Sequence, residues 1–142
     1  MKIIIGSDHR GYELKEKIKQ NFADFDWEDV GTENGLDRVD YPIFAQKICR
    51  SILAGEAEKA IVICGSGVGV SIASNRFKGI YAALCWSPEV ARAAKEHDHA
   101  NVLALPADFM DASEAVKIVK SWLEASFKGG RYEKRLEMLD NF

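Results

Sequence analysis

The sequence predicts an α/β protein with a doubly wound, Rossmann-like fold, in which helices cover both faces of a five-stranded parallel sheet in a three-layer sandwich. Short β-branched or apolar runs alternate with segments of helical periodicity along the whole chain. The run at residues 60–64 is apolar without alternation, which is typical of a strand covered on both faces. Ligands of such folds bind beyond the carboxyl ends of the strands, so candidate functional residues are sought there.

The first half of the chain predicts two strands and two helices. Residues 2–6 form a β-branched run that ends in glycine, and a helix with Tyr12 and Ile18 on its apolar face follows. A short strand is expected at residues 27–30. Asp40 is a candidate N-cap for the next helix, which Gly55 ends.

The second half predicts three further strands, at residues 60–64, 79–85 and 101–105, each followed by a helix. Ser87 and Pro88 have the residue types of an N-cap and a first helical position. The helix after the last strand is expected to run to Phe127, and another helix follows near the end of the chain. No Pro-, Gly- or Ser-rich stretch divides the chain, which predicts one domain over residues 1–142.

The composition excludes several classes of function. The chain has 142 residues and a formal net charge of −3, with acidic and basic residues interleaved, which argues against a nucleic-acid partner. No run of about 18 apolar residues predicts a membrane span. The three cysteines are an odd number without C-x-x-C spacing, and no secretory signal peptide is recognised, so we expect a cytoplasmic protein.

Polar residues are dense where the first strand is expected to end. The sequence GSDHRG at residues 6–11 places a carboxylate, an imidazole and a guanidinium, from Asp8, His9 and Arg10, in a single turn. These side chains are candidates for binding a polar ligand. The alternative is that Asp8 caps the following helix and the other two are solvated.

A glycine-rich loop, CGSGVGVS at residues 64–71, follows the third strand. Alternating glycines allow several backbone N–H groups to point at one anionic atom, and the start of the next helix adds a positive dipole end. The same surroundings favour the thiolate of Cys64, which makes it a candidate base or nucleophile. The alternative is a buried cysteine that only packs. The loop lacks the residues of a Walker motif, of a dinucleotide fingerprint and of a low-molecular-weight tyrosine phosphatase.

Two of the three histidines, His97 and His99, lie in the sequence EHDHAN at residues 96–101. They could bind a metal with a third ligand, but a general acid or base for a sugar hydroxyl is the more natural role, because imidazole titrates near neutral pH. A solvated loop is the remaining alternative. Near the end of the chain, Arg131 and Arg135 are four residues apart on one helix face, which suits a phosphate or an ordinary charged surface.

The chain resembles the type B ribose-5-phosphate isomerase family, which includes galactose-6-phosphate isomerase subunits. The resemblance runs nearly from end to end and is carried by residues 7–11 (SDHRG), 40–42 (DYP), 64–69 (CGSGVG), 71–76 (SIASNR), 101–104 (NVLA) and 129–131 (GGR). It implies an enzyme that interconverts aldose and ketose phosphates without a metal or cofactor. It also implies a homodimer or a dimer of dimers, with active sites between subunits and the C-terminal helix packed on a partner.

The resemblance implies a role for each candidate residue. Cys64 would be the base that moves a proton between C1 and C2 through an enediolate, assisted by Ser66, and His97 would open the sugar ring. Asp8 and His9 would hold ring hydroxyls, and Arg131 and Arg135 would bind the phosphate, with Arg10 nearby. The backbone N–H groups that would stabilise the oxyanion belong to Gly65, Gly67, Val68 and Gly69.

The chain departs from the family at three positions. Asp98, which the resemblance implies to be a substrate-binding position, stands where relatives usually carry asparagine after the ring-opening histidine. Asp108 stands where many have a third arginine that binds the phosphate, and Tyr132 stands where a histidine often follows the first tail arginine. The two carboxylates would weaken phosphate binding unless they point away or pair with Arg10 or another cation.

Ribose 5-phosphate is therefore the expected substrate, and a six-carbon sugar phosphate such as galactose 6-phosphate is the alternative. A non-catalytic sugar-phosphate binding subunit and a cysteine-dependent hydrolase are further hypotheses. The hydrolase requires His97 within hydrogen-bonding distance of Cys64.

Overall fold

The computed structural model describes residues 2–142, and its strands and helices alternate along most of the chain. In order, the elements are β1 (Lys2–Ser7), α1 (Tyr12–Asn21), β2 (Asp26–Asp29), α2 (Tyr41–Leu53), β3 (Lys59–Cys64), α3 (Val68–Ser74), β4 (Ala82–Leu84), α4 (Pro88–Asp98), β5 (Val102–Pro106), α5 (Ala112–Glu124) and α6 (Arg131–Asp140). Every strand pair in the sheet is parallel.

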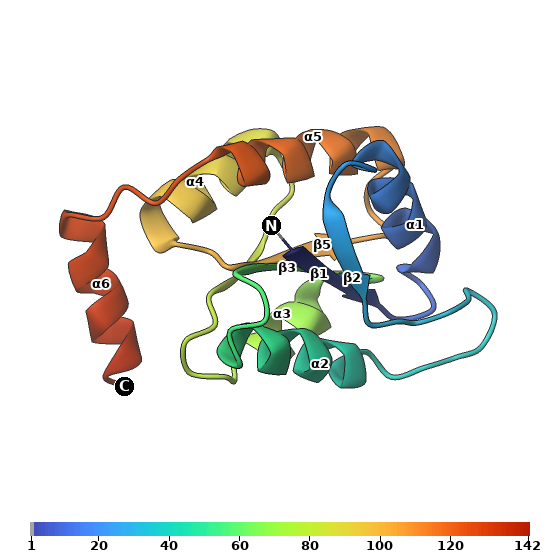
Figure 1. Ribbon diagram of the computed structural model, residues 1–142, viewed down its shortest axis with the longest axis horizontal. Helices are drawn as coiled ribbons and strands as arrows, with labels where there is room; N and C mark the ends of the chain where they lie inside the picture. The colour runs from blue at the N-terminus through green and yellow to red at the C-terminus, as the bar shows by residue number, and fades with distance from the viewer. Residues whose placement is uncertain (1) are drawn as a thin grey trace.

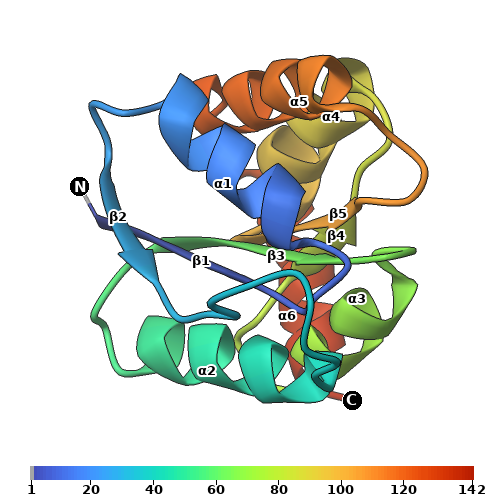
Figure 2. The same ribbon diagram turned by 90° about the vertical axis from the view of Figure 1, so that its right-hand side faces the viewer.

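The sheet has the strand order β2-β1-β3-β5-β4. The chain builds outward from β1 to β2 and then returns to add β3 on the other side, so β1 and β3 form the switch point at which ligands of such sheets bind. Helices α1, α4 and α5 cover one face and α2 and α3 cover the other (Figure 2). This arrangement confirms the predicted doubly wound fold.

Two apolar cores lie between these layers. Ile5, Ile61 and Leu103 point toward α1, α4 and α5, where the indole of Trp122 is fully buried. Ile4 and Val62 belong to the second core, which packs against α2 and α3. The alternation along each strand divides its side chains between the two faces, which is why the runs are apolar throughout.

Helix α6 lies outside the three layers, beside α4 at one end of the molecule (Figure 1). Leu136 is its one buried residue. Met138, Leu139 and Phe142 are large apolar side chains that remain exposed on or just after this helix, with Phe142 wholly exposed. No helix within residues 2–142 is long and apolar enough to cross a membrane.

Two predicted boundaries are wrong in detail. Strand β4 begins at Ala82 rather than at residue 79, because the Tyr81 N–H bonds to the Asn101 side chain (2.8 Å). Helix α5 ends at Glu124, and the following segment runs instead to α4, where the Lys128 N–H donates to the Glu96 carbonyl (3.0 Å).

Of the two predicted N-cap residues, only Ser87 makes a side-chain capping hydrogen bond. Asp40 occupies the N-cap position of α2, but its side chain makes no capping hydrogen bond, and its carbonyl accepts the Ile43 N–H instead. Ser87 caps α4 as predicted, because its hydroxyl accepts the Val90 N–H.

Candidate active site

A cavity of about 530 Å³ lies at the carboxyl ends of β1, β3 and β5, and we call it the carboxyl-edge site. This volume is in the range of small-molecule sites. Its lining comes from four connections: Asp8 and Arg10 after β1, Tyr41 at the start of α2, Cys64, Gly65, Ser66, Val68, Gly69 and Ile72 after β3, and Asp108 after β5. Most of the predicted residues that follow β1 and β3 are therefore brought together.

Cys64 ends β3 and is only 4% exposed. Its Sγ accepts a hydrogen bond from the Gly67 N–H (3.2 Å), so the loop directs an amide at the sulfur. The exposed hydroxyl of Ser66 accepts the Val68 N–H (3.2 Å) and lies on the same loop.

The loop requires glycine for two separate reasons. Gly67 has a φ of 73°, and a Cβ there would lie 2.5 Å from Leu84 and 3.1 Å from the Leu105 backbone. A Cβ on Gly69 would lie 2.5 Å from the ring of Tyr41. Glycine therefore allows both the left-handed turn and the close approach of α2 to the loop.

Asp8 lines the carboxyl-edge site from the β1–α1 turn and is 5% exposed. Its Oδ1 accepts the N–H groups of Arg10 (3.0 Å) and Gly11 (3.1 Å). Burial raises the pKa of this carboxyl, and the bond from Gly11 opposes the shift. The side chain is therefore held in place by its own turn, and it is not the N-cap of α1, which is Gly11.

His9 is half-buried and does not belong to the lining of the cavity. Its Nδ1 accepts the Val39 N–H (3.2 Å), which ties the β1–α1 turn to the segment before α2. This bond requires a lone pair on Nδ1, so the neutral ring carries its proton on Nε2.

Arg10 and Asp108 form an ion pair at the rim of the same cavity. Nε of Arg10 donates to Oδ2 of Asp108 (2.7 Å), and Nη2 contacts the same oxygen. The carboxylate raises the pKa of Arg10 through this hydrogen bond.

A second group of predicted residues lies on α4 and α6, and we call it the amino-edge cluster: His97, Arg131, Tyr132 and Arg135. The ring of His97 stacks on the ring of Tyr132, with centroids 4.5 Å apart. The guanidinium groups of Arg131 and Arg135 lie 5.0 and 5.8 Å from the Tyr132 centroid. Arg131 also donates to the Tyr132 hydroxyl (3.0 Å), which lowers the pKa of that phenol.

The two groups are not brought together within one chain. Cys64 is level with Pro106 at the carboxyl end of β5, whereas His97 and Asp98 precede Val102 at its amino end. The four residue steps of β5 alone span about 13 Å. None of the amino-edge residues lines the carboxyl-edge site.

Asp98 is exposed and lines a different hollow, about 580 Å³ in volume, between α6 and the segment that leads into β4. Across this hollow the Tyr81 hydroxyl donates to Asp140 (2.6 and 2.8 Å), which fastens the end of α6. Burial first, and then the Asp140 carboxylate, raise the pKa of Tyr81 to about 12. The position beside a substrate predicted for Asp98 is therefore not formed by one chain alone.

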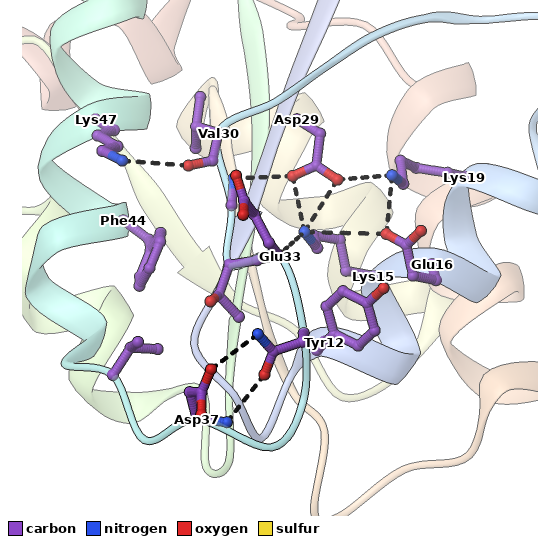
Figure 3. Close-up of a pocket in the computed structure, with 14 residues that line it drawn as sticks. Tyr12, Lys15, Glu16, Lys19, Asp29, Val30, Glu33, Asp37, Phe44 and Lys47 are labelled. Carbon is purple, nitrogen blue, oxygen red and sulfur yellow. Dashed lines mark hydrogen bonds and ion pairs between the residues drawn. The ribbon is translucent and has the colours of Figure 1, made fainter.

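A third cavity, about 520 Å³, lies between α1, β2 and the segment before α2 (Figure 3). Nζ of Lys15 donates to both oxygens of Asp29 (2.8 and 2.9 Å) and to the Thr32 carbonyl (2.6 Å). Burial opposes ionisation of Asp29, but Lys15 and Lys19 outweigh it and lower the pKa of that carboxyl. The ammonium groups of Lys15 and Lys19 in this cavity are therefore paired with a carboxylate of the protein itself.

Sequence reasoning missed Tyr41 as a lining residue, although it lies in the DYP motif. No local signal in the sequence identified it, because the room that Gly69 leaves for the ring exists only once α2 packs against the loop. Among residues 2–142, no group of three or more His, Cys, Asp or Glu side chains is arranged to hold a metal ion.

Comparisons with known proteins agree with this architecture. A family model described as ribose/galactose isomerase matches residues 3–139. Ribose-5-phosphate isomerase B of Escherichia coli strain K12 is 39% identical over 140 residues, which cover 97% of this chain and 93% of that protein.

Solved structures agree equally well. A ribose 5-phosphate isomerase from Thermotoga maritima superimposes with a TM-score of 0.97 at 45% identity, covering 99% of this chain and 98% of that one. Ribose-5-phosphate isomerase B from Mycoplasma genitalium, solved with bound ribulose-5-phosphate, has a TM-score of 0.93 at 38% identity, with 99% and 94% covered. The match spans almost the whole chain in each case, and the protein belongs to the ribose/galactose isomerase family.

Proposed function

We propose that this protein is a sugar-phosphate isomerase that converts ribose 5-phosphate to ribulose 5-phosphate, with Cys64 as the base. The observation that carries this proposal is the position of Cys64. It lies at the switch point of the sheet, lines the carboxyl-edge site, and its sulfur accepts an amide hydrogen bond. Relatives named as ribose-5-phosphate isomerase B support the substrate.

The reaction requires a proton to leave C2 of the open-chain aldose and to arrive at C1. In the proposed mechanism the Cys64 thiolate takes the C2 proton, and the electrons move onto O1 to give an enediolate. A proton then passes from O2 to O1, and the thiol returns its proton to C1 as the C2 carbonyl forms. Amide N–H groups of the 65–69 loop stabilise the negative charge that develops on the oxygen. Ser66 assists this transfer, and Asp8 holds hydroxyl groups of the sugar.

The site requires a second copy of the chain. Ring opening is assigned to His97, and phosphate binding to Arg131 and Arg135, yet these residues lie at the opposite edge of the sheet from Cys64. In the proposed homodimer, the amino-edge cluster of each chain completes the carboxyl-edge site of the other. The exposed apolar side chains of α6, Met138 and Leu139, provide surface for such an interface.

A reducing compartment follows from this chemistry, because only a free thiol can act as the base. Cys49, Cys64 and Cys85 are all free and buried. Burial raises the pKa of Cys49 to about 11 and of Cys85 to about 12, which leaves these two thiols protonated at neutral pH. These properties support the cytoplasm as the site of action.

The test is the rate of ribose 5-phosphate conversion by the wild type and by Cys64→Ala, each in the presence of a chelator. Loss of a general base removes about 10²–10⁴-fold in rate, so the variant is expected to lose at least a hundredfold. Cys49→Ala is the matched control, because Cys49 is equally buried but lies between α2 and α3, away from the cavity. Full activity in Cys64→Ala would refute the mechanism.

Other functions are distinguished by the same assays. Turnover of a six-carbon sugar phosphate without turnover of ribose 5-phosphate would show that the substrate belongs to the alternative class. The structural reason to test this class is the Arg10–Asp108 pair, in which Asp108 stands where many relatives have an arginine that binds the phosphate. Binding of ribose 5-phosphate without turnover of any sugar phosphate would indicate a binding subunit. A hydrolase needs His97 beside Cys64, and one chain does not provide this arrangement.

A further inference from the structure

Helix α6 is attached to the rest of the chain along one face. Within the helix, only Tyr132, Leu136 and Asp140 are buried or half-buried, and its other residues are exposed. The three residues are four positions apart, so their side chains follow one another along the same side of the helix. They provide attachment points over about 12 Å of helix.

The three attachments differ in chemistry. At the start of α6, the ring of Tyr132 stacks on that of His97. In the middle, Leu136 is buried but also lines the hollow between α6 and the segment that leads into β4. At the end, both oxygens of Asp140 lie within 2.8 Å of the Tyr81 hydroxyl. The far end of the helix is therefore held across a hollow by a hydrogen bond.

The near end of α6 follows a pair of glycines. The backbone N–H and the Nζ of Lys128 both contact Glu96 of α4, at 3.0 Å each, so the chain is fixed up to this point. Gly129 and Gly130 then have φ values of 65° and 58°, and a Cβ on either would meet no atom of residues 2–142 within 4 Å. Because packing does not restrain these glycines, they can act as a hinge, and the attachments of α6 set its orientation.

Tyr81 is itself fixed by the backbone. Its N–H donates to the Asn101 side chain (2.8 Å), and its carbonyl accepts the Asn101 N–H (3.1 Å). Asn101 lies on the α4–β5 connection, directly after the helix that carries His97. The pKa of about 12 keeps the Tyr81 phenol protonated at neutral pH, so it remains a hydrogen-bond donor.

We propose that Tyr81 is a positioning residue, whose hydroxyl fixes the end of α6 and thereby holds the Arg135 guanidinium in the orientation that binds the substrate phosphate. Along the helix axis from Gly130, Arg135 lies at about 7.5 Å and Asp140 at about 15 Å. Arg131 is next to the hinge, at about 1.5 Å. Rotation about the hinge that displaces Asp140 therefore displaces Arg135 about half as far and Arg131 very little. This inference rests on the proposed function.

The first test is steady-state kinetics with ribose 5-phosphate for the wild type, Tyr81→Phe and Asp140→Ala. Each variant removes the hydrogen bond and leaves both arginines in place. We expect KM to rise about fivefold while kcat stays within about twofold, because the bond acts on phosphate binding rather than on proton transfer. Asp140→Asn retains an acceptor oxygen and should stay near the wild-type KM. An unchanged KM in both Tyr81→Phe and Asp140→Ala would overturn the proposal.

A second readout distinguishes positioning of Arg135 from a general loss of packing. In Arg135→Gln the guanidinium is already absent, so adding Tyr81→Phe should raise KM little further. In Arg131→Gln the same addition should multiply KM by the full factor, because Arg131 adjoins the hinge. Multiplication by the full factor in both backgrounds would show that Tyr81 does not act through Arg135, and the assignment would be wrong.

Tyr12→Phe is the matched control, because it removes the same hydroxyl from a tyrosine on α1, where the ring lies 5.2 Å from Nζ of Lys15. Its KM should equal that of the wild type. If Tyr81→Phe does not fold, as judged by circular dichroism, Asp140→Ala tests the same bond.

Hydrogen exchange tests the attachment without turnover. Release of the end of α6 should speed exchange of the amides of residues 136–140 by about tenfold in Tyr81→Phe. Unchanged exchange would overturn the role of Tyr81 in holding the helix. Absence of turnover by the wild type, together with faster exchange in the variant, would refute the proposed function alone.

Discussion

The carboxyl-edge site and the amino-edge cluster are built in different ways. At the carboxyl edge, backbone groups do most of the positioning: the Gly67 N–H meets the Cys64 sulfur, and two amides hold Asp8. At the amino edge, side chains position one another, as Tyr132 stacks with His97 and contacts both arginines. The first is tied to the sheet, whereas the second lies on α4 and on the peripheral helix α6.

In the proposed mechanism, this difference separates two tasks. Proton transfer needs atoms held within a fraction of an ångström, which a loop anchored between parallel strands provides. Binding a phosphate needs cationic groups, which in the proposed dimer the other chain would bring to the ligand. The amino-edge cluster has such groups but no thiol, and the carboxyl-edge site has the Cys64 thiol but no unpaired cation among residues 2–142.

The largest expected effect comes from combining defects in the two regions. Cys64→Ala and His97→Gln are each expected to be nearly inactive as homodimers. Coexpression in equal amounts should restore about a quarter of the wild-type activity, since half of the randomly paired dimers contain one intact site of two. The measurement is ribose 5-phosphate turnover after purification of the mixed population.

The control for this experiment is the coexpression of two variants whose defects lie in the same site. Coexpression of Cys64→Ala with Asp8→Asn places both defects in the carboxyl-edge site, so no gain over the parents is expected. If Cys64→Ala with His97→Gln also shows no gain while the mixed dimers form, each chain carries its own complete site, and the division into two complementary regions is wrong.

The next effect tests the backbone of the carboxyl-edge site. Gly67→Ala combines a positive φ with a Cβ placed 2.5 Å from Leu84. We expect it to lower the free energy of unfolding by about 2–4 kcal/mol and to reduce kcat by more than tenfold. Chemical denaturation and steady-state kinetics measure these changes.

Gly55→Ala is the control for this change, because its φ is 77° but no atom lies within 4 Å of the added Cβ. This substitution should lower the free energy of unfolding only by the backbone strain, about 1 kcal/mol, and leave kcat unaltered. Equal losses of stability at the two positions would show that the contact with Leu84 is relieved by local movement.

The smallest effect tests the side chains of the amino edge. Tyr132→Leu removes the ring that positions His97, Arg131 and Arg135, all of which remain present. Since Tyr132 lies near the surface, we expect an unchanged unfolding midpoint and an increase of about tenfold in KM for ribose 5-phosphate. Tyr132→Phe retains the ring and should keep most of the affinity. A large loss of stability in Tyr132→Leu would instead assign the ring to packing.

Much of the fold was predictable because the signals are local. The run at residues 60–64 is buried throughout β3, and the capping residue Ser87 begins α4 as expected. The errors lie where distant contacts decide. Strand β4 is shortened by the Asn101 side chain, and α5 ends early because the segment after it is bonded to α4.

The candidate site was predictable to a similar degree. The turns after β1 and β3 contain reactive or polar side chains next to glycines, so Asp8, Cys64 and Ser66 could be chosen from the sequence. Tyr41 could not, because it reaches the site from α2. His9 was expected to face the ligand, but it does not line the cavity, and its Nδ1 instead binds the backbone before α2.

The sequence by itself determined the alternation of strands and helices, the glycine loop and the types of side chain at the strand ends, because each depends on residues close together in the chain. Only the tertiary structure decided which of these ends share a cavity. Strand order brings Arg10 and Asp108, 98 positions apart, across the end of β3. The reversed direction of α4 places His97 at the far edge, since a crossover helix between parallel strands must run back along the sheet.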